Sequence, residues 1–347
     1  MYEEIVSFDN LMLAASEAAK GKRYKAPIMS YMANVEENVI NTQNHLVWGS
    51  YTPSPHRQFF VFEPKKRLIS APPFADRVVH HAIHRVVEPV IDKRFIHDSY
   101  ACRTGKGTHK GVSRAQKFMQ IVKRNHGRVY VFKADISKYF DSINHNTLKL
   151  ILSKHITCPR TYSLLCTIID GPNPKSERLG VGIPIGNLTS QLFANLYLNE
   201  LDQYVKHSLR EKYYIRYMDD FVIIHHDKAH LQRVRADVER WLIDNLQLKT
   251  NHKTQVFPVS KHRGRSLDFL GYRLYTTHKL MRKCTEKRMR YKIKRLREKY
   301  GEGLVSQEEV RSVIASYVGC AKHASAYGLL TRVLQKPFTR KCEDENI

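Results

Sequence analysis

Two adjacent carboxylates lie in the middle of the stretch KYYIRYMDDFVIIHH, residues 212–226. Asp219 and Asp220 separate two runs of β-branched and aromatic residues that are typical of strands. Two like charges repel, and burying them is costly unless a cation offsets them. Carboxylate ligands without a cysteine or a convincing histidine nearby favour Mg²⁺ or Mn²⁺ over zinc. Taken alone, however, the pair is equally typical of an Asp-rich β-turn.

A third carboxylate, Asp135, ends another apolar segment in RVYVFKADISKYFDSI, 84 residues upstream of Asp219. The pattern predicts a buried strand over residues 129–134 that turns into a short helix. Pairing of this strand with the hairpin would bring the three acids together. Such a cluster predicts a site for two Mg²⁺ ions, or Mn²⁺, of the kind that promotes phosphoryl transfer by in-line displacement.

The charge balance indicates the kind of partner. Lysine and arginine number 58 against 33 acidic residues, a formal net charge of +25, which exceeds what solubility requires. No apolar run approaches the length of a membrane span, and the first residues, MYEEIVSFDN, lack the pattern of a signal peptide. We therefore expect a nucleic-acid partner and no membrane.

Two other sequence patterns could form a metal-binding or phosphate-binding site. His80 and His84 in HHAIHR have the i,i+4 spacing of a metal-binding pair. The general-base glutamate of a zinc protease is missing between them, so we expect a solvated basic helix face. The loop SYACRTGKGTHKG lacks the spacing of an ATPase phosphate loop, and contact with a nucleic-acid backbone is the better interpretation.

The elements that position these residues follow from periodicity and turn residues. Helices are predicted within residues 1–46, over 76–95 with Asp76 as N-cap, and over 145–178, 188–205, 228–246 and 276–347. Strand pairs are predicted over residues 47–69, with a basic tip, and over 266–275. Residues 281–300 hold ten Lys or Arg, which predicts a basic surface for a duplex backbone. The apolar stripe predicted for that helix is Tyr291, Ile293, Leu296 and Tyr300.

The order of these motifs resembles that of a reverse transcriptase over roughly residues 60–275. The basic strand pair, DISKYFDSI at a strand end, YMDD in a hairpin and FLGY downstream occur in the same order in that family. The resemblance implies an α+β right-hand polymerase with fingers, a palm made of an antiparallel sheet with helices on one face, and a helical thumb. The implied domains are N-terminal helices and fingers over 1–127, palm over 128–144, fingers over 145–178, palm over 179–275 and thumb over 276–347.

The resemblance also implies roles for individual residues. Asp135 and Asp219 would bridge both metal ions, and Asp220 would support the site. Phe140 would be the steric gate against a ribose 2′-hydroxyl, although a core aromatic on a short helix is the alternative. The other implied nucleotide-binding residues are Lys65, Lys66, Arg67, Arg77, Ile185, Gln191 and Lys253, the last of which would protonate or steady pyrophosphate. The implied primer grip is Phe269, Leu270, Gly271 and Tyr272.

The segment IPIGNLTSQ, residues 183–191, bears on the type of reverse transcriptase. Intron-encoded and retroviral enzymes usually have Pro-Gln-Gly where this chain has Pro184-Ile185-Gly186. Together with Ser190-Gln191, the segment resembles the enzymes of diversity-generating retroelements. Those enzymes copy a template-repeat RNA into cDNA with frequent errors opposite adenine, and the cDNA diversifies a target gene. Ile185 in place of a Gln amide removes a hydrogen bond from the nucleotide pocket, so we expect weaker discrimination.

This resemblance implies the partners and the setting. The partners are template RNA, the RNA/cDNA duplex, deoxynucleoside triphosphates and a pentameric accessory variability determinant protein. The setting is the cytoplasm of a bacterium, for a bacterial or phage-encoded enzyme. A retron-type or phage-defence reverse transcriptase is the alternative within the same palm architecture. A non-catalytic RNA-binding protein with a decayed palm would have lost metal-binding acids, whereas all three are present.

Overall fold

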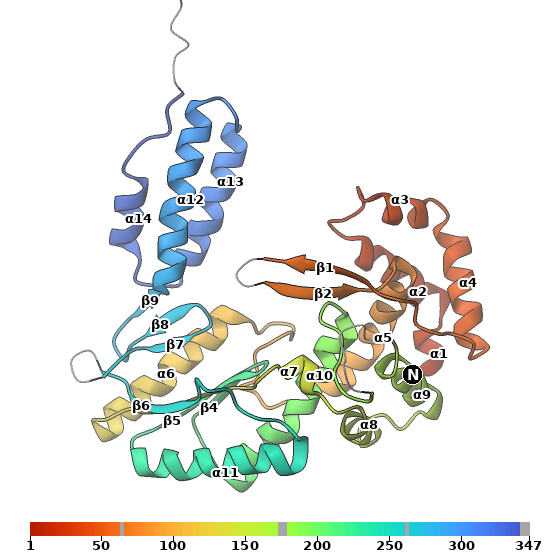
Figure 1. The fold of residues 1–347 in the computed structure, drawn as a ribbon, viewed down its shortest axis with the longest axis horizontal. Coiled ribbons are helices and arrows are strands. Elements are labelled where there is room, and N and C mark those ends of the chain that lie inside the picture. The colour runs from red at the N-terminus through yellow and green to blue at the C-terminus, as the bar shows by residue number, and fades with distance from the viewer. Residues whose placement is uncertain (63–65, 173–178, 261–263, 341–347) are drawn as a thin grey trace, which may run out of the picture. The chain divides into compact units, whose positions relative to one another are not determined.

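The computed structural model describes residues 1–62, 66–172, 179–260 and 264–340 (Figure 1). The chain folds into two compact units. Unit 1 consists of Met1–Gly107, Lys133–Phe221 and Arg233–Gln255, and unit 2 of Thr108–Phe132, Val222–Gln232 and Val256–Ile347. Both units mix helices with strands, as expected for the α+β class.

The first part of unit 1 is a group of helices followed by a hairpin. The elements are α1 (Tyr2–Ile5), α2 (Phe8–Ala19), α3 (Ala26–Ala33), α4 (Val35–Val47), β1 (Arg57–Val61), β2 (Arg67–Ala71) and α5 (Phe74–Asp92). Helix α2 starts at a serine cap, where Ser7 Oγ accepts from Asn10 N at 3.3 Å. Its buried face is largely alanine, which lets α2 approach α5 closely. The strand pair β1–β2 confirms the predicted hairpin.

Helix α5 differs from its prediction in two respects. It begins at Phe74, so Asp76 is not the N-cap but lies in the first turn, 3% exposed, and accepts from Tyr51 Oη and Ser54 N. His80 is 3% exposed and bonded to Thr189 Oγ1 at 2.8 Å. Burial lowers the pKa of His80 to about 3, so its ring is neutral. The interpretation of a solvated basic face is therefore wrong for His80, because α5 packs against both α2 and α10.

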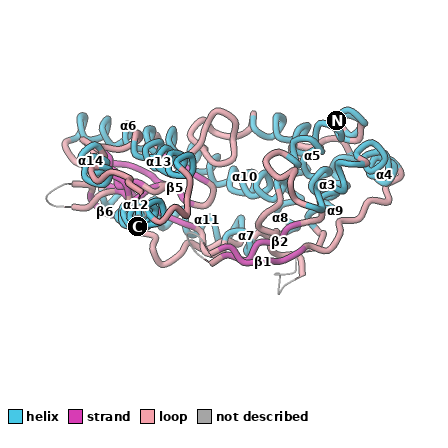
Figure 2. The backbone as a smooth tube through the Cα atoms, turned by 90° about the horizontal axis from the view of Figure 1, so that it is seen from above, coloured by secondary structure: helices cyan, strands magenta, loops and turns pink. Residues whose placement is uncertain are grey.

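The middle of unit 1 is built around one buried helix. Helix α10 (Leu188–Gln203) is buried on nearly all sides and lies beside α5 (Figure 2). The elements near it in sequence are α7 (Tyr139–Ser142), α8 (His145–Ser153), α9 (Pro159–Ile169), a π-helical turn (Tyr204–Ser208) and α11 (Lys228–Leu246). The four-stranded sheet has the order β4 (Tyr214–Tyr217), β5 (Asp220–His225), β3 (Tyr130–Asp135) and β6 (Gln255–Pro258). Strands β3 and β5 are therefore neighbours, as the sequence predicted. Of the four strands, β4 belongs to unit 1, and β5, β3 and β6 contain residues of both units.

Unit 2 contains a small antiparallel sheet and a helical bundle. Its elements include α6 (Thr108–His126), the three-stranded sheet β7 (Leu267–Phe269), β8 (Tyr272–Leu274) and β9 (Lys279–Met281), and then α12 (Lys283–Gly301), α13 (Gln307–Ala321) and α14 (Tyr327–Leu334). The last three helices pack together (Figure 1), which confirms a helical C-terminal segment.

The apolar stripe of α12 was predicted incorrectly at one position. The buried residues are Met289, Ile293 and Leu296, whereas the Tyr291 side chain is 61% exposed. Positions 289, 293 and 296 follow the i, i+4, i+7 rule, and position 291 lies on the opposite side of the helix.

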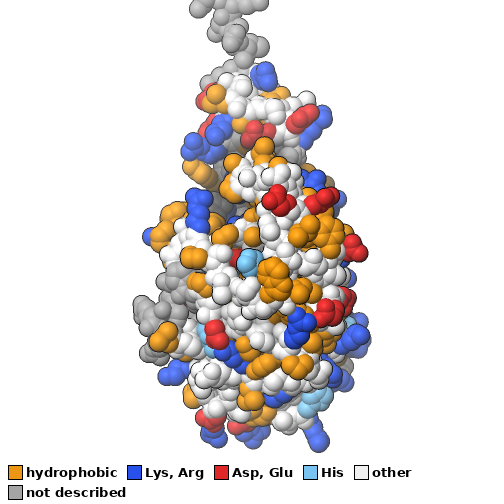
Figure 3. Space-filling view, turned by 90° about the vertical axis from the view of Figure 1, so that its right-hand side faces the viewer, with side chains coloured by type: hydrophobic (Ala, Val, Ile, Leu, Met, Phe, Trp, Pro, Cys, Tyr) orange, Lys and Arg blue, Asp and Glu red, His pale blue; other side chains and the backbone are white. Residues whose placement is uncertain are grey.

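The surface carries charged and apolar side chains together. On the face drawn in Figure 3, blue Lys and Arg side chains lie between orange hydrophobic ones. No helix among the described residues is long and apolar enough to cross a membrane.

Candidate active site

The predicted catalytic acids lie at the ends of neighbouring strands in unit 1. Asp135 is the last residue of β3, and Asp220 is the first of β5. Met218 and Asp219 form the two-residue turn between β4 and β5, with Met218 in the left-handed region at φ 55°. A left-handed residue suits the tight hairpin that places Asp219 at the strand end.

Asp135 and Asp219 lie close enough for their carboxyl groups to share a hydrogen bond. Burial, followed by the neighbouring charges of Asp135 and Asp220, raises the pKa of Asp219 to about 7. The strand ends thus hold two repelling carboxyl groups in half-buried positions. A cation between them would remove this penalty.

Asp220 has a different environment. Lys133 Nζ, two residues before the end of β3, donates to Asp220 Oδ2 at 3.1 Å, and both side chains are about one-fifth exposed. The chain itself therefore supplies a positive charge to Asp220. The implied division of roles, in which Asp135 and Asp219 bind metal and Asp220 supports the site, stays a prediction.

The donor chemistry at Asp135 and Asp219 fits a divalent cation that prefers oxygen ligands. Among the described residues, no three acidic, histidine or cysteine side chains stand together at the spacing of a complete metal site. Mg²⁺ ions usually keep several water ligands and take only one or two carboxylates from the protein, so a pair of acids is a sufficient protein contribution.

A buried ion pair holds the hairpin that carries Asp219. Arg216 on β4 and Asp202 on α10 are both 0% exposed, and Arg216 donates to the Asp202 carboxylate through Nε at 2.7 Å and Nη2 at 2.6 Å. Tyr214 Oη donates to the same carboxylate at 2.6 Å. Arg216 Nη1 also donates to the carbonyl oxygen of Met218 at 3.0 Å, directly before Asp219. The ion pair thus anchors the catalytic turn to α10.

Asn251 holds the other carboxylate. Its Nδ2 donates to Asp135 Oδ2 at 2.6 Å, and its backbone N donates to the Asp135 carbonyl oxygen at 2.8 Å. Its own Oδ1 accepts from the backbone N of Lys253 at 2.9 Å. Asn251 therefore fixes the orientation of Asp135 and ties it to the loop that carries Lys253.

Replacing Asn251 by alanine should lower the rate of DNA synthesis, or the affinity for Mg²⁺, by about 10–100-fold, the usual cost of losing a partner that orients a metal ligand. The rate should be measured across a range of Mg²⁺ concentrations. Asn245→Ala is the matched control, because that amide is exposed and donates to the carbonyl of Trp241 in its own helix. Equal effects of the two substitutions would contradict a role for Asn251 at Asp135.

The pKa of Asp219 predicts how stability depends on pH without divalent ions. Between about pH 4 and pH 7 the native protein retains a proton that the unfolded chain releases. The native state should therefore lose up to a few kcal/mol of stability as the pH rises through 7, on the scale of about 1.4 kcal/mol per pKa unit. Urea unfolding in EDTA at pH 5 and pH 8 measures this. The comparison is with Asp219→Asn, because His80, whose pKa burial lowers, titrates on unfolding over the same pH range in both proteins and its contribution cancels. The stability of wild type relative to Asp219→Asn should fall from pH 5 to pH 8, whereas its stability relative to Asp244→Asn, at an exposed acid on α11, should not change.

The other predicted nucleotide-binding residues lie at several places in unit 1. Phe140 packs edge-on against Tyr139, and its carbonyl accepts from Ile183 N. The Ile185 carbonyl accepts from Ser70 N on β2 at 3.1 Å, which ties this segment to the hairpin. Gln191 lies in the first turn of α10, and Lys253 is exposed.

Three of the four predicted basic nucleotide-binding residues near the hairpin are described. Lys65 lies outside the described residues. Lys66 Nζ lies 4.4 Å from the ring centre of Phe60, and Arg67 pairs with Val61 at the start of β2. Arg77 lies on α5, where its Nε donates to the Pro72 carbonyl. Their roles in nucleotide binding stay predictions.

The predicted primer grip is a tight hairpin in unit 2. Phe269 pairs with Tyr272, and Leu270 and Gly271 form the turn between them with φ of 50° and 88°. Two successive positive φ values are typical of a type I′ hairpin. Tyr272 Oη donates to the Cys320 carbonyl on α13 at 3.0 Å, so this hairpin is held by the C-terminal helices.

The sequence did not point to Lys133, Asp202, Arg216 or Asn251. One signal was available for Arg216, which is the single charged residue of the segment YYIRYM. A charge in such a position is tolerated only with a partner. Asp202 has no such signal, because Glu200 lies beside it in LYLNELDQYV. Which charges pair could not be read from the chain.

Comparisons with known proteins identify the family. A family model described as reverse transcriptase (RNA-dependent DNA polymerase) matches residues 58–274, well over half of the chain. Protein YkfC of Escherichia coli is 26% identical over 320 residues, covering 79% of this chain and 77% of YkfC. The group II intron-encoded protein LtrA of Lactococcus lactis is 27% identical over 49% of this chain and 28% of LtrA. The chain thus matches little more than a quarter of that intron-encoded relative.

Solved structures share the fold at low sequence identity. Telomerase from Candida tropicalis, in complex with a fragment of telomeric RNA, has a TM-score of 0.54 and 11% identity, covering 88% of this chain and 59% of the telomerase. The apo form of that telomerase has a TM-score of 0.53 and 12% identity, covering 81% and 59%. These likenesses agree with a right-hand polymerase fold. The chain belongs to the reverse transcriptase family of RNA-dependent DNA polymerases.

Proposed function

We propose that this chain synthesises DNA on an RNA template by two-metal nucleotidyl transfer. The observation that carries the proposal is the placement of Asp135, Asp219 and Asp220 together at the ends of the neighbouring strands β3 and β5. Asp135 and Asp219 would hold the divalent ions that reverse transcriptases generally use. When bound, such ions offset negative charge on the reacting phosphates.

The residues of the chain would then orient the reactants. Asn251 and Arg216 would keep the two carboxylates in fixed positions, and Lys133 would hold Asp220. Lys253, whose backbone N donates to Asn251, would bring a proton or positive charge to pyrophosphate. Phe140 would exclude ribonucleotides. The residue ranges predicted from the sequence for fingers, palm and thumb would form these three domains of the polymerase.

We further propose that the enzyme is of the diversity-generating type and makes errors opposite adenine in a template-repeat RNA. Support comes from Ile185, which is half-buried and is fastened through its carbonyl to Ser70 of the hairpin. The family's usual Gln amide at this position would offer hydrogen bonds to the nucleotide. An apolar side chain in the same place offers none. A mispaired nucleotide then loses less binding free energy relative to a correctly paired one. A pentameric accessory protein would act with it.

Sequencing of cDNA made from a defined RNA, with the accessory protein present, tests this type. Errors should concentrate opposite template adenine, and Ile185→Gln should reduce them. Leu150→Gln, at an exposed residue of α8, is the control for adding an amide. Equal error rates at all four template bases would exclude the mutagenic type and leave the polymerase proposal standing.

A second candidate is an accurate reverse transcriptase of the intron-encoded type. The similarity to LtrA favours it, since that relative is 27% identical over the shared region. The same sequencing experiment separates the two candidates, because only the mutagenic type concentrates its errors opposite adenine.

A further inference from the structure

A buried histidine of unit 1 is bonded to the segment that carries Ile185. His145 is the first residue of α8 and is 7% exposed. Its Nε2 lies 2.8 Å from the carbonyl oxygen of Gly182, which precedes Ile185 by one short stretch of chain. A carbonyl oxygen only accepts, so Nε2 donates this hydrogen bond. The backbone N of His145 also donates to the Gly180 carbonyl at 2.9 Å. His145 therefore holds the segment through both its side chain and its main chain.

The same segment is bonded to the residue predicted to be the steric gate. The backbone N of Ile183 donates to the Phe140 carbonyl at 2.9 Å, and the backbone N of Gly182 donates to the Ile143 carbonyl at 2.7 Å. These bonds fix the distance between Phe140 and the segment. The bond from the His145 side chain secures the carbonyl side of Gly182 while the bond to Ile143 secures its amide side.

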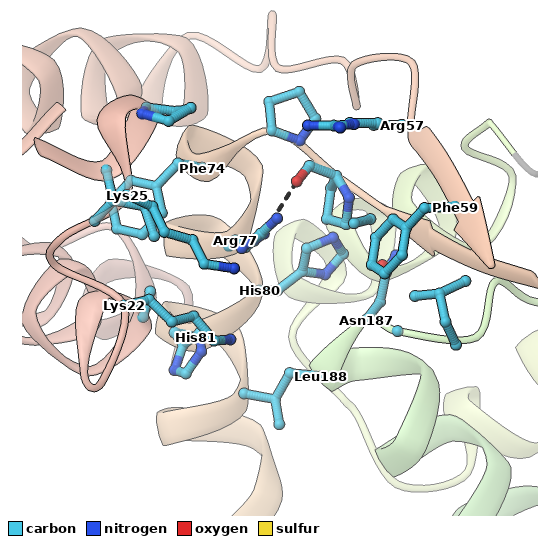
Figure 4. Close-up of a pocket in the computed structure, with 18 of the residues that line it drawn as sticks. Lys22, Lys25, Arg57, Phe59, Phe74, Arg77, His80, His81, Asn187 and Leu188 are labelled. Atoms are coloured by element: carbon cyan, nitrogen blue, oxygen red, sulfur yellow. Dashed lines mark hydrogen bonds between the residues drawn. The ribbon is translucent and has the colours of Figure 1, made fainter. Parts of the chain in front are cut away.

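The far end of the segment lies against the β1–β2 hairpin. The Ile185 carbonyl accepts from Ser70 N at 3.1 Å. Gly186 has a φ of 131°, and a Cβ at this position would lie 2.9 Å from the Ser70 carbonyl oxygen, so there is no room for a side chain. Residues 187 and 188 line a cavity of about 690 Å³ together with residues of β1 and β2 (Figure 4). The segment is thus fixed to the hairpin at one end and to α8 at the other.

The other ring nitrogen of His145 faces an acid. Its Nδ1 lies 3.4 Å from Asp170 Oδ1, and the Asp170 side chain is 53% exposed and also bonds to Lys149. Solvent screens an exposed acid at this distance, so its attraction for the ring is weak. The contact that holds the segment is therefore the buried one through Nε2.

We propose that His145 is a positioning residue for nucleotide selection. Its bond to Gly182 keeps residues 180–186 at the distance from Phe140 that admits a deoxynucleotide and leaves no space for a ribose 2′-hydroxyl. When the bond is lost the segment shifts, and the pocket discriminates less between deoxynucleotides and ribonucleotides. This role rests on the proposed function, because Phe140 and Ile185 select nucleotides only if the chain polymerises them.

Incorporation of a single nucleotide on a primed RNA template by the full-length chain tests the role. In His145→Ala the ratio of kcat/KM for dATP to that for ATP should fall by about three- to tenfold, the value of one hydrogen bond. The KM for dATP should rise more than kcat falls. His145→Gln should keep the ratio within about twofold of wild type, since its amide nitrogen is as many bonds from Cβ as Nε2 is. His145→Asn should behave as His145→Ala does, because its amide nitrogen corresponds to Nδ1 instead.

His155→Ala is the matched control, since it removes a half-buried imidazole just beyond the other end of α8. It should leave the ratio within about twofold of wild type. Hydrogen exchange without nucleotide gives a readout that needs no activity. The amides of Gly182 and Ile183 should exchange faster in His145→Ala and His145→Asn, and at the wild-type rate in His145→Gln.

The Gln and Asn variants decide the test if His145→Ala does not fold. Equal selectivity of the Gln and Asn variants, or an effect of His155→Ala as large as that of the His145 variants, would overturn the role while wild type still polymerises. A wild type that incorporates no nucleotide would refute the proposed function, and this role with it.

Discussion

Asp219→Asn lowers the rate of DNA synthesis on a primed RNA template by about a thousandfold or more, at the upper end of what one electrostatic group contributes to a transition state. The substitution keeps the size of the side chain and removes its charge. Asp219 and Asp135 are the two acids that lie together, so a single neutral amide should disable the pair. Primer extension with Mg²⁺ measures the rate, and Mn²⁺ binding followed by electron paramagnetic resonance should weaken in parallel.

Asp220→Asn provides the internal comparison. Asp220 is already paired with Lys133, so its loss should reduce synthesis less than the loss of Asp219. Asp244→Asn on α11 controls for the removal of a negative charge elsewhere in the unit. Full activity in Asp219→Asn, or in the double variant with both acids of the turn replaced by alanine, would refute the assigned mechanism.

The sequence predicted the elements of the fold well where local patterns decide them. The strand ending at Asp135, the YMDD hairpin and the helix over residues 188–205 all occur as predicted, since each is marked by a clear apolar pattern or a turn. The start of α5 was missed because an acid near a helix start resembles an N-cap. In the structure Asp76 instead accepts from Tyr51 and Ser54, two partners that are distant in sequence.

The partners of the catalytic acids could not be predicted for the same reason. The adjacency of Asp219 and Asp220 is visible in the sequence, but nothing local distinguishes them. In the structure they differ because Lys133 reaches Asp220, while Asp135 faces Asp219. The Asn251 contact likewise joins residues 116 positions apart. Periodicity identifies which side of an element is buried, whereas contacts of this kind depend on the three-dimensional fold.

The burial of His80 could not be predicted from the local sequence either. A histidine on a helix with basic neighbours is usually solvated, and the spacing of His80 and His84 gave no contrary sign. Burial of His80 depends on α10, more than a hundred residues later, which brings Thr189 against it. Burial lowers the pKa of His80, so the same contact also determines its charge.

The largest effect on stability is expected at the buried ion pair behind the catalytic turn. Asp202→Ala leaves the Arg216 guanidinium without its counter-charge in a position that is 0% exposed. Breaking a buried pair in this way should cost about 3–5 kcal/mol of unfolding free energy. Urea unfolding measures it, and Glu308→Gln, an exposed acid on α13, should change it by less than about 0.5 kcal/mol.

The double variant Asp202→Leu, Arg216→Met separates stability from catalysis. Replacing both charges by apolar side chains removes the unpaired charge, so it should recover much of the stability lost in Asp202→Ala. It does not restore the hydrogen bond from Arg216 to the Met218 carbonyl, so the turn that carries Asp219 loses its anchor. We therefore expect a folded protein with reduced synthesis. If the double variant were both stable and fully active, Arg216 would serve only to neutralise Asp202, and the geometry of the turn would have to come from the hairpin itself.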